Sequence, residues 1–322
     1  MLSFKEIESV VSKNPALEDL KDSRDFLFKD VIGAVTIPKN FSLRAAQTSV
    51  KSQGARGTCV GMASTAMTEF HNAKEYVNPN LDLSEEYMFK RIKDIDKKDY
   101  NYEGYGAYAR SGAKALVKYG SCLESTAPYN TSNKEDIWKS FTVSPEMDEE
   151  AASYRMKSYL SVSRREEEIK KALTATNTPL LATVKLHESY RQAKKDGAVP
   201  VPKEGEKVIG GHAMLITGYS SDYIEFKNSW GEGWGDEGYL YWPWANVENL
   251  GVSIWAFTDL ILNPYIEEEA LIELNKKYLL YHQVNSWDKA IKQGIVTGGT
   301  VPKDVLTKGD LMVFFDRMGF FK

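Results

Sequence analysis

The stretch that decides the fold is SQGARGTCVGMASTAMTEF, residues 52–70, in which a glycine-rich approach runs directly into a helix-forming segment. Apolar residues recur there at three-to-four residue spacing, which predicts an amphipathic helix that opens near Cys59. The unpaired N–H groups and positive dipole end of a helix N-terminus favour a thiolate over a thiol. Cys59 is therefore a candidate nucleophile, and a buried structural cysteine is the plainer alternative. Six residues earlier, the Gln53 amide would complete an oxyanion hole with the Cys59 N–H.

A nucleophilic cysteine needs a base, and the chain has four histidines to choose from: His71, His187, His212 and His282. His212 stands out because GGHAMLITGY places it at the start of a predicted buried strand, after two small residues that leave room for substrate. Asn228 ends the next predicted strand, YIEFKNSW, and a hairpin would bring its amide beside the imidazole. Sulfur, base and orienting group together are the parts of an activated nucleophile. Trp230 would shield the amide from water, or belong to a β-bulge with core aromatics.

The apolar pattern divides the chain into successive parts. Residues 1–36 are predicted to be a short helical lead, and helical periodicity dominates from 37 to about 150. Strand-like runs broken by Gly, Asp and Asn turns then continue from about 151 to 262. Residues 263–322 return to amphipathic helical spacing and predict a small C-terminal module. The sequence therefore predicts an α+β protein with a helical lobe and a β lobe between two appended segments.

The composition excludes several functional classes. At 322 residues, with 42% hydrophobic and 27% charged residues, the chain can bury a sizeable core, and no apolar run is long enough to span a bilayer. A net charge of -4 offers no basic face for nucleic acid. Two cysteines, without a C-x-x-C or H-E-x-x-H pattern, predict neither a disulfide framework nor a metal site. The first residues lack a basic-then-apolar secretory pattern, which predicts a cytoplasmic protein or one carried in an assembly.

These residues, taken in order, resemble the papain family of cysteine peptidases, family C1. QGARGTC is similar to the family's Gln-Gly-x-x-x-x-Cys, GGHAMLITGY to its His-Ala strand, and KNSWGEGWGDEGY to its Asn-Ser-Trp-Gly signature. The resemblance covers about residues 37–262 and implies a papain-like fold, with a helical lobe and an antiparallel β-barrel-like lobe. It also implies a cysteine-type peptidase that hydrolyses peptides or proteins in a cleft between the lobes, without a cofactor.

Carried over position by position, the resemblance implies four catalytic residues: Cys59 as nucleophile, His212 as general acid–base, Asn228 as orienter of the imidazole, and Gln53 as oxyanion donor. It also implies that substrate lies against small residues on both lobes: Gly106, Ala107, Gly211 and Ala213. Two residues depart from the pattern of secreted members, since Arg56 stands where they carry a disulfide cysteine and Val60 replaces their tryptophan. The chain is closest in look to the disulfide-poor prokaryotic branch, and Cys122 is interpreted as a packed thiol.

Both ends of the chain carry separate expectations. Residues 1–36 are too few for the long helical prosegment of many relatives, and a shorter blocking segment is the alternative. Residues 263–322 weakly resemble a surface-layer-homology or cell-wall module, which predicts a cell-wall or assembly partner and a cell-surface location.

Two other functions compete with peptide hydrolysis. An amine could intercept the same thioester, which would make the chain a transpeptidase. The scaffold could instead serve as a non-catalytic component of a cell-surface or phage-like assembly, although the intact Cys, His, Asn and Gln set favours an enzyme.

Overall fold

A computed structural model describes residues 4–23, 25–32, 35–76, 80–132, 137–193 and 195–258. The predicted C-terminal module at 263–322 lies outside these residues. The helices are α1 (Phe4–Val11), α2 (Phe28–Val31), α3 (Cys59–Tyr76), α4 (Glu85–Tyr100), α5 (Ala109–Lys118), α6 (Ile137–Ser140), α7 (Pro145–Ala151) and α8 (Glu166–Thr176). The strands are β1 (Ala16–Leu17), β2 (Phe41–Ser42), β3 (Ala107–Tyr108), β4 (Ser158–Ser161), β5 (Leu180–His187), β6 (Val208–Tyr219), β7 (Tyr223–Lys227), β8 (Tyr239–Pro243) and β9 (Leu250–Thr258).

The helical lobe is built around α3, which packs against α4, α5 and the sheet strand β6. Most positions along its first three turns are buried, as expected of a helix that is surrounded on all sides. Gly112 allows α5 to approach α3 closely, because a Cβ atom there would lie 2.5 Å from Ser64 Oγ. Close packing around α3 fixes the helix whose first residue is Cys59.

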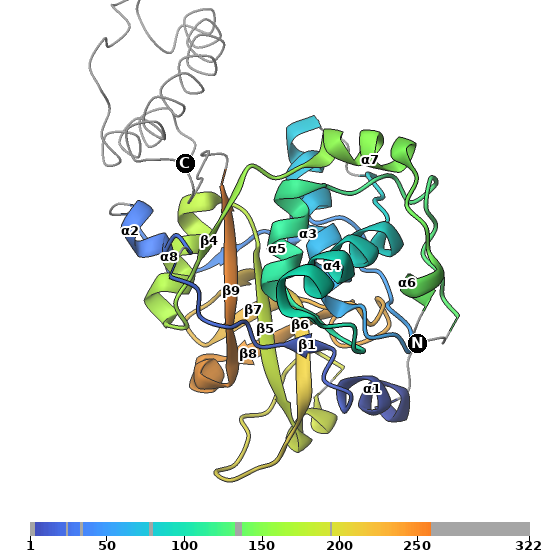
Figure 1. The fold of residues 1–322 in the computed structure, drawn as a ribbon. Helices are drawn as coiled ribbons and strands as arrows, with labels where there is room; N and C mark the ends of the chain where they lie inside the picture. Colours follow the sequence, from blue (N-terminus) through green and yellow to red (C-terminus); the bar gives the residue numbers. More distant parts are fainter. Residues whose placement is uncertain are drawn as a thin grey trace, which may run out of the picture.

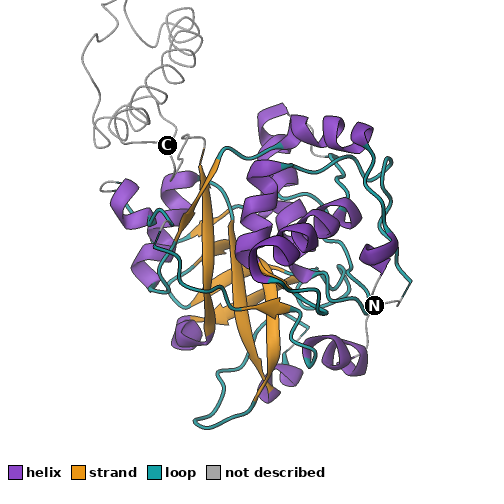
Figure 2. Ribbon diagram, viewed as in Figure 1, coloured by secondary structure: helices purple, strands orange, loops and turns teal. Residues whose placement is uncertain are grey.

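The β lobe is a seven-stranded sheet in the order β4-β9-β5-β6-β7-β8, with β2 paired to β6. All of its named strand pairs are antiparallel. Figures 1 and 2 show α3, α4 and α5 on one side of the sheet and α2 and α8 on the other. The predicted two-lobe α+β fold is therefore confirmed.

Strand boundaries differ from the sequence-based expectation in one place that matters for the site. His212 was expected at the start of a strand, but β6 begins at Val208, which pairs with His187 at the end of β5. The long β5–β6 hairpin extends the strand beyond the apolar run, because backbone pairing continues where the side chains become small and polar. His212 consequently lies within a paired strand, opposite Val184.

The N-terminal lead runs along both lobes. Helix α1 buries Ile7 and Val11 in the core cluster that includes β6, and β1 pairs in parallel with β3 of the helical lobe. Helix α2 then buries Phe28 and Val31 in the β-lobe core. A helical lead was expected over 1–36, but among the described residues of that range only α1 and α2 are helical, and they are separated by the short strand β1. Figure 1 shows β1 passing between β6 and the helical lobe.

Candidate active site

The thiol of Cys59 lies at the first residue of α3, as the sequence predicts, and is completely buried. The backbone N–H groups of Ala213, Val60 and Cys59 itself favour the thiolate, and Ala213 follows His212 on β6. Burial raises the pKa of Cys59 to about 12, and the backbone N–H donors offset only part of this increase. The thiolate expected at a helix N-terminus is therefore not favoured in this conformation, because loss of solvent outweighs the helix dipole.

His212 and Asn228 form a hydrogen-bonded pair across β6 and β7, with His212 Nε2 2.8 Å from Asn228 Oδ1. The Ser229 N–H also donates to Asn228 Oδ1, so this oxygen is the acceptor and His212 Nε2 carries the proton. His212 Nδ1 is then the basic nitrogen, and it is buried without a hydrogen-bond partner among the described residues. Burial lowers the pKa of His212 to about 4, and the bond to Asn228 counteracts this only in part. The imidazole is therefore neutral here.

Trp230 stacks on the imidazole of His212, with ring centroids 4.7 Å apart and an angle of 25° between the planes. Its side chain is only 1% exposed, and it also packs edge-on against Trp234. Aromatic stacking of this kind restricts the rotation of the imidazole. Trp230 thus lies where the sequence predicts, beside the histidine–asparagine pair.

Gln53 is held firmly in the loop before α3. Its Nε2 donates to the Arg56 carbonyl at 2.7 Å, its Oε1 accepts from Ser229 Oγ at 2.7 Å, and its N–H donates to the Ser229 carbonyl at 2.9 Å. A primary amide carries two N–H donors, so one remains after the bond to Arg56. Gln53 is therefore oriented by both lobes and keeps one donor available.

Arg56 stabilises the loop at the position where secreted relatives carry a cysteine. Its guanidinium pairs with Glu86, at 2.6 and 2.9 Å, and also donates to the Asn130 carbonyl at 2.8 Å. Both charged side chains are almost fully buried. Bidentate pairing of arginine and carboxylate fixes geometry as well as charge. This ion pair provides a non-covalent tie between the loop and α4.

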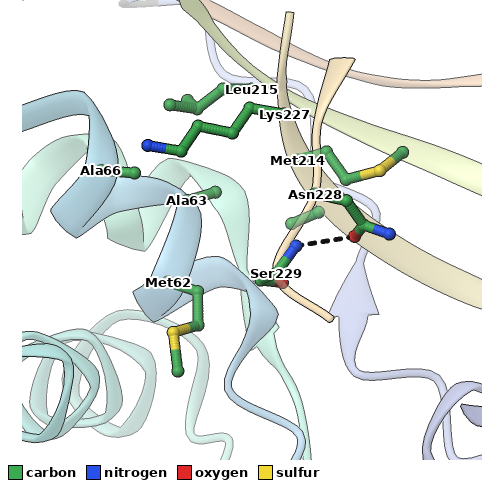
Figure 3. A pocket seen from close by; sticks show the side chains of 9 residues that line it. Met62, Ala63, Ala66, Met214, Leu215, Lys227, Asn228 and Ser229 are labelled. Atoms are coloured by element: carbon green, nitrogen blue, oxygen red, sulfur yellow. Dashed lines mark hydrogen bonds between the residues drawn. The ribbon is translucent and has the colours of Figure 1, made fainter. Parts of the chain in front are cut away.

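A small cavity of about 20 Å³ lies behind Asn228, between α3 and the paired strands β6 and β7. In Figure 3 the Lys227 side chain extends toward Ala66 on α3. Lys227 Nζ donates to the carbonyl of Thr48 at 2.8 Å and to its hydroxyl at 3.1 Å, and that hydroxyl donates to Glu69. Burial lowers the pKa of Lys227 to about 8. The residue next to Asn228 is thus anchored to the loop that leads to α3.

The four predicted substrate-contacting residues lie where the N-terminal lead crosses the molecule. Ala16 pairs with Ala107, and the Ala107 N–H donates to the Pro15 carbonyl at 3.1 Å. A Cβ atom on Gly106 would lie 2.5 Å from that same carbonyl oxygen. On the β lobe, the Gly211 N–H donates to Asn14 Oδ1 at 2.8 Å, and a Cβ atom there would lie 2.3 Å from the Ala16 carbonyl oxygen.

Residues 14–19, here called the interlobe segment, therefore lie against both lobes. Ala16 shares a buried apolar cluster with Cys59, Ala107 and Ala213. Ala213 thus shares one apolar cluster with both Cys59 and Ala16 of the interlobe segment. The glycines at 106 and 211 were expected to make room for substrate, and in this structure the chain's own backbone fills that room.

Sequence reasoning missed the residues that hold the interlobe segment. Asn14 and Asp19 contact residues about a hundred or more positions away, and neither lies in a recognisable motif. The anchoring role of Lys227 also escaped notice, although its position directly before Asn228 was a usable signal. No cluster of three metal-ligating side chains occurs among the described residues, and no helix there is long and apolar enough to cross a bilayer.

The fold and the placement of these residues define a class: two-lobe α+β proteins with a cysteine at a helix N-terminus of one lobe and a hydrogen-bonded histidine–asparagine pair on the sheet of the other. Comparison with known proteins gives this class a family. The family model described as papain family cysteine protease matches residues 37–255, and the chain belongs to that family of cysteine peptidases.

Individual relatives agree with the family assignment. The chain is 29% identical over 232 residues to an uncharacterized peptidase C1-like protein of Acanthamoeba polyphaga mimivirus, covering 66% of this chain and 71% of that protein. It is 28% identical over 214 residues to papain of Carica papaya, covering 65% of this chain and 55% of papain. The crystal structure of xylellain, a cysteine protease from Xylella fastidiosa, matches with a TM-score of 0.66 at 24% identity, covering 77% of this chain and 97% of that one.

Proposed function

We propose that this cysteine peptidase hydrolyses peptide bonds through a thioester on Cys59, with His212 as general acid–base. The observation that carries the proposal is the tautomer of His212, whose Nε2–H is fixed by Asn228 while Nδ1 stays unpartnered among the described residues. A base held in one orientation with a free lone pair, on a strand that packs against the helix whose first residue is Cys59, is suited to activating a sulfur nucleophile. Asn228 acts as the orienter and Trp230 limits access of water to the pair.

In the proposed reaction, His212 Nδ1 takes the thiol proton and the sulfur attacks the carbonyl carbon of the scissile peptide. The resulting oxyanion is stabilised by the Cys59 N–H and by the remaining donor of Gln53. Collapse breaks the C–N bond, and the imidazolium gives its proton to the departing amine. Water deprotonated by the same imidazole then attacks the thioester, releases the carboxylic acid and restores the thiol.

We also propose that the interlobe segment blocks this site in the conformation described above. Cys59 and His212 are both 0% exposed, and Asn14, Pro15 and Ala16 contact the residues expected to bind substrate. Burial also keeps the thiol and the imidazole neutral, since the pKa of Cys59 is raised to about 12 and that of His212 is lowered to about 4. Displacing the segment would expose the pair to solvent and allow the thiolate–imidazolium pair to form.

A peptide-library digest tests both proposals with the full-length chain. Ala16→Arg places a charge at a position that is only 4% exposed, so the segment is expected to leave the site. We expect the Ala16→Arg protein to cleave peptides and the unsubstituted chain to cleave them much more slowly. Adding Cys59→Ser should abolish cleavage, whereas the matched Cys122→Ser change should preserve it. Cleavage that survives Cys59→Ser would refute the assignment of the nucleophile.

A further inference from the structure

We propose that Arg110, together with N–H donors on α5 and β9, forms a recognition site for an acidic side chain of the substrate, and that Asp19 occupies this site in the blocked conformation. The proposal rests on the proposed peptidase function and on displacement of the interlobe segment together with Leu20 and Asp25, which follow it in the N-terminal lead. It assigns a substrate preference, for peptides with Asp or Glu near the cleaved bond.

The carboxylate of Asp19 is bound by donors from both lobes. The Arg110 backbone N–H, in the first turn of α5, lies 3.0 and 3.1 Å from the two carboxylate oxygens. The indole Nε1–H of Trp255, on β9, donates to one of them at 3.0 Å. The Asp19 N–H also donates to Ser253 Oγ at 3.1 Å. A helix N-terminus and a neighbouring cation are both suited to binding a carboxylate.

The side chain of Arg110 is turned toward the same place and is only 4% exposed. Its guanidinium donates to the Leu20 carbonyl at 2.6 Å and forms a close ion pair with Asp25. It lies 5.4 Å from the centre of the Trp255 ring, and Tyr100 of α4 is its partner from the helical lobe. Arg110 Nε is buried and has no hydrogen-bond partner among the described residues.

The hydrogen-bond acceptors and donors of this site come from different parts of the chain. The acceptors that neutralise Arg110 come from residues 19–25 of the N-terminal lead, whereas the donors belong to α5 and β9 and stay with the lobes. When the lead is displaced, a buried guanidinium and two N–H donors lose their acceptors. Leaving such groups unpaired costs free energy, and an acidic substrate side chain would restore the pairing. A neutral side chain would restore only part of it.

The site lies within reach of a peptide bound at Cys59. Ala16 shares the apolar cluster of Cys59 and pairs with Ala107. Three residues further along each of these two segments, Asp19 accepts a hydrogen bond from Arg110. An extended peptide advances about 3.3 Å per residue, so three residues span about 10 Å. The acidic residue recognised by Arg110 should therefore lie within about four residues of the cleaved bond.

The test uses the full-length Ala16→Arg protein and fluorogenic peptides that differ only by Glu or Gln, scanned through the four positions on each side of the cleaved bond. We expect one position at which Glu raises kcat/KM at least tenfold over Gln, and this ratio should fall as ionic strength rises. Adding Arg110→Gln should bring the ratio close to one, and Arg110→Lys should retain part of it because the charge remains.

The outcomes separate this inference from the proposed function. Cleavage with a Glu-to-Gln ratio near one at every position, or a ratio that Arg110→Gln leaves unchanged, would overturn the acidic preference and leave the peptidase assignment standing. If no peptide is cleaved although Cys59 of the Ala16→Arg protein is alkylated rapidly and completely, the proposed function would instead be refuted. Slow alkylation of the buried Cys122 in the same sample shows that each Arg110 variant is folded. If Arg110→Gln prevents folding, the Glu-to-Gln ratio of kcat/KM is measured in Arg110→Lys instead. A ratio equal to that of the protein with Arg110, at both low and high salt, would contradict the inference.

Discussion

Cys59 and Cys122 are buried to the same extent, but different parts of the chain surround them. Cys59 and Cys122 are both 0% exposed, and burial raises the pKa of each thiol to about 12. Cys122 is enclosed by permanent core, in a cluster with Tyr87, Ala127 and Ala151. Cys59 shares its apolar cluster with Ala16 of the N-terminal lead. Equal burial therefore accompanies two different surroundings, and only that of Cys59 includes a residue of the proposed blocking segment.

The difference shows that burial and pKa in a single conformation do not identify a nucleophile. The distinguishing features are the oriented imidazole of His212 and the contacts of the interlobe segment with β3 and β6. No histidine is among the described side chains that influence the pKa of Cys122, which are Ser84, Glu124 and Glu150.

The largest expected effect separates the two thiols by function. In the Ala16→Arg background, Cys59→Ser should lower kcat/KM by about a thousandfold or more, because a hydroxyl is a far weaker nucleophile at neutral pH. Cys122→Ser should change it less than threefold. Steady-state hydrolysis of a peptide library, with circular dichroism as a control for folding, measures both. A similar loss in both variants would erase the distinction.

The next effect concerns the cover over Cys59. Ala16→Arg should raise peptidase activity by about a hundredfold over the unsubstituted chain, because the buried charge costs several kcal/mol of docking free energy. Leu20→Arg is the matched control, since Leu20 lies in the same lead but is 61% exposed. Initial rates at one protein concentration make the comparison. If Leu20→Arg activates as strongly as Ala16→Arg, local docking at β3 is not the cause.

A smaller effect is expected from pH. The pKa of His212 is lowered from 6.5 to about 4 in the blocked conformation, so the open or unfolded chain binds more protons below pH 6.5. The blocked conformation therefore keeps its full stability above pH 6.5 and loses on the order of 3 kcal/mol from this residue as pH falls toward 4.

Thermal unfolding of the full chain between pH 7 and pH 4 measures this dependence. We expect Tm to fall more steeply for the unsubstituted chain than for His212→Gln, which has no titrating group at that position. The difference between the two curves isolates the histidine from the other titrating groups. Identical slopes would show that His212 is not held neutral by burial.

The smallest effect should come from Lys227. Its replacement by Met removes two hydrogen bonds to Thr48 and loosens the strand end that carries Asn228. We expect a loss in kcat of about fivefold with little change in KM, because positioning and not substrate binding is affected. Lys118→Met, at the end of α5, is a control distant in the chain. An altered KM with normal kcat would assign Lys227 to substrate binding.

Much of the fold, and the placement of several candidate site residues, could be predicted because the signals are local. The glycine-rich entry to α3 places Cys59 at a helix terminus, and a hairpin of two apolar strands brings His212 and Asn228 together. The protonation states of Cys59 and His212 could not be predicted. They depend on burial, and the interlobe segment lies forty or more residues before Cys59 in the sequence. The sequence pattern also does not reveal that Asn14 hydrogen-bonds Gly211 or that Asp19 hydrogen-bonds Arg110. Single long-range contacts of this kind produce no periodicity in the sequence.

The most direct test of the blocked site is the alkylation of both thiols in the same sample, followed by mass spectrometry of the two cysteine-containing peptides. In the unsubstituted chain Cys59 and Cys122 should both react slowly at pH 7. In Ala16→Arg, Cys59 should react about a hundredfold faster while Cys122 stays slow. If both thiols accelerate together, or if neither does, the N-terminal lead is not what controls access to Cys59.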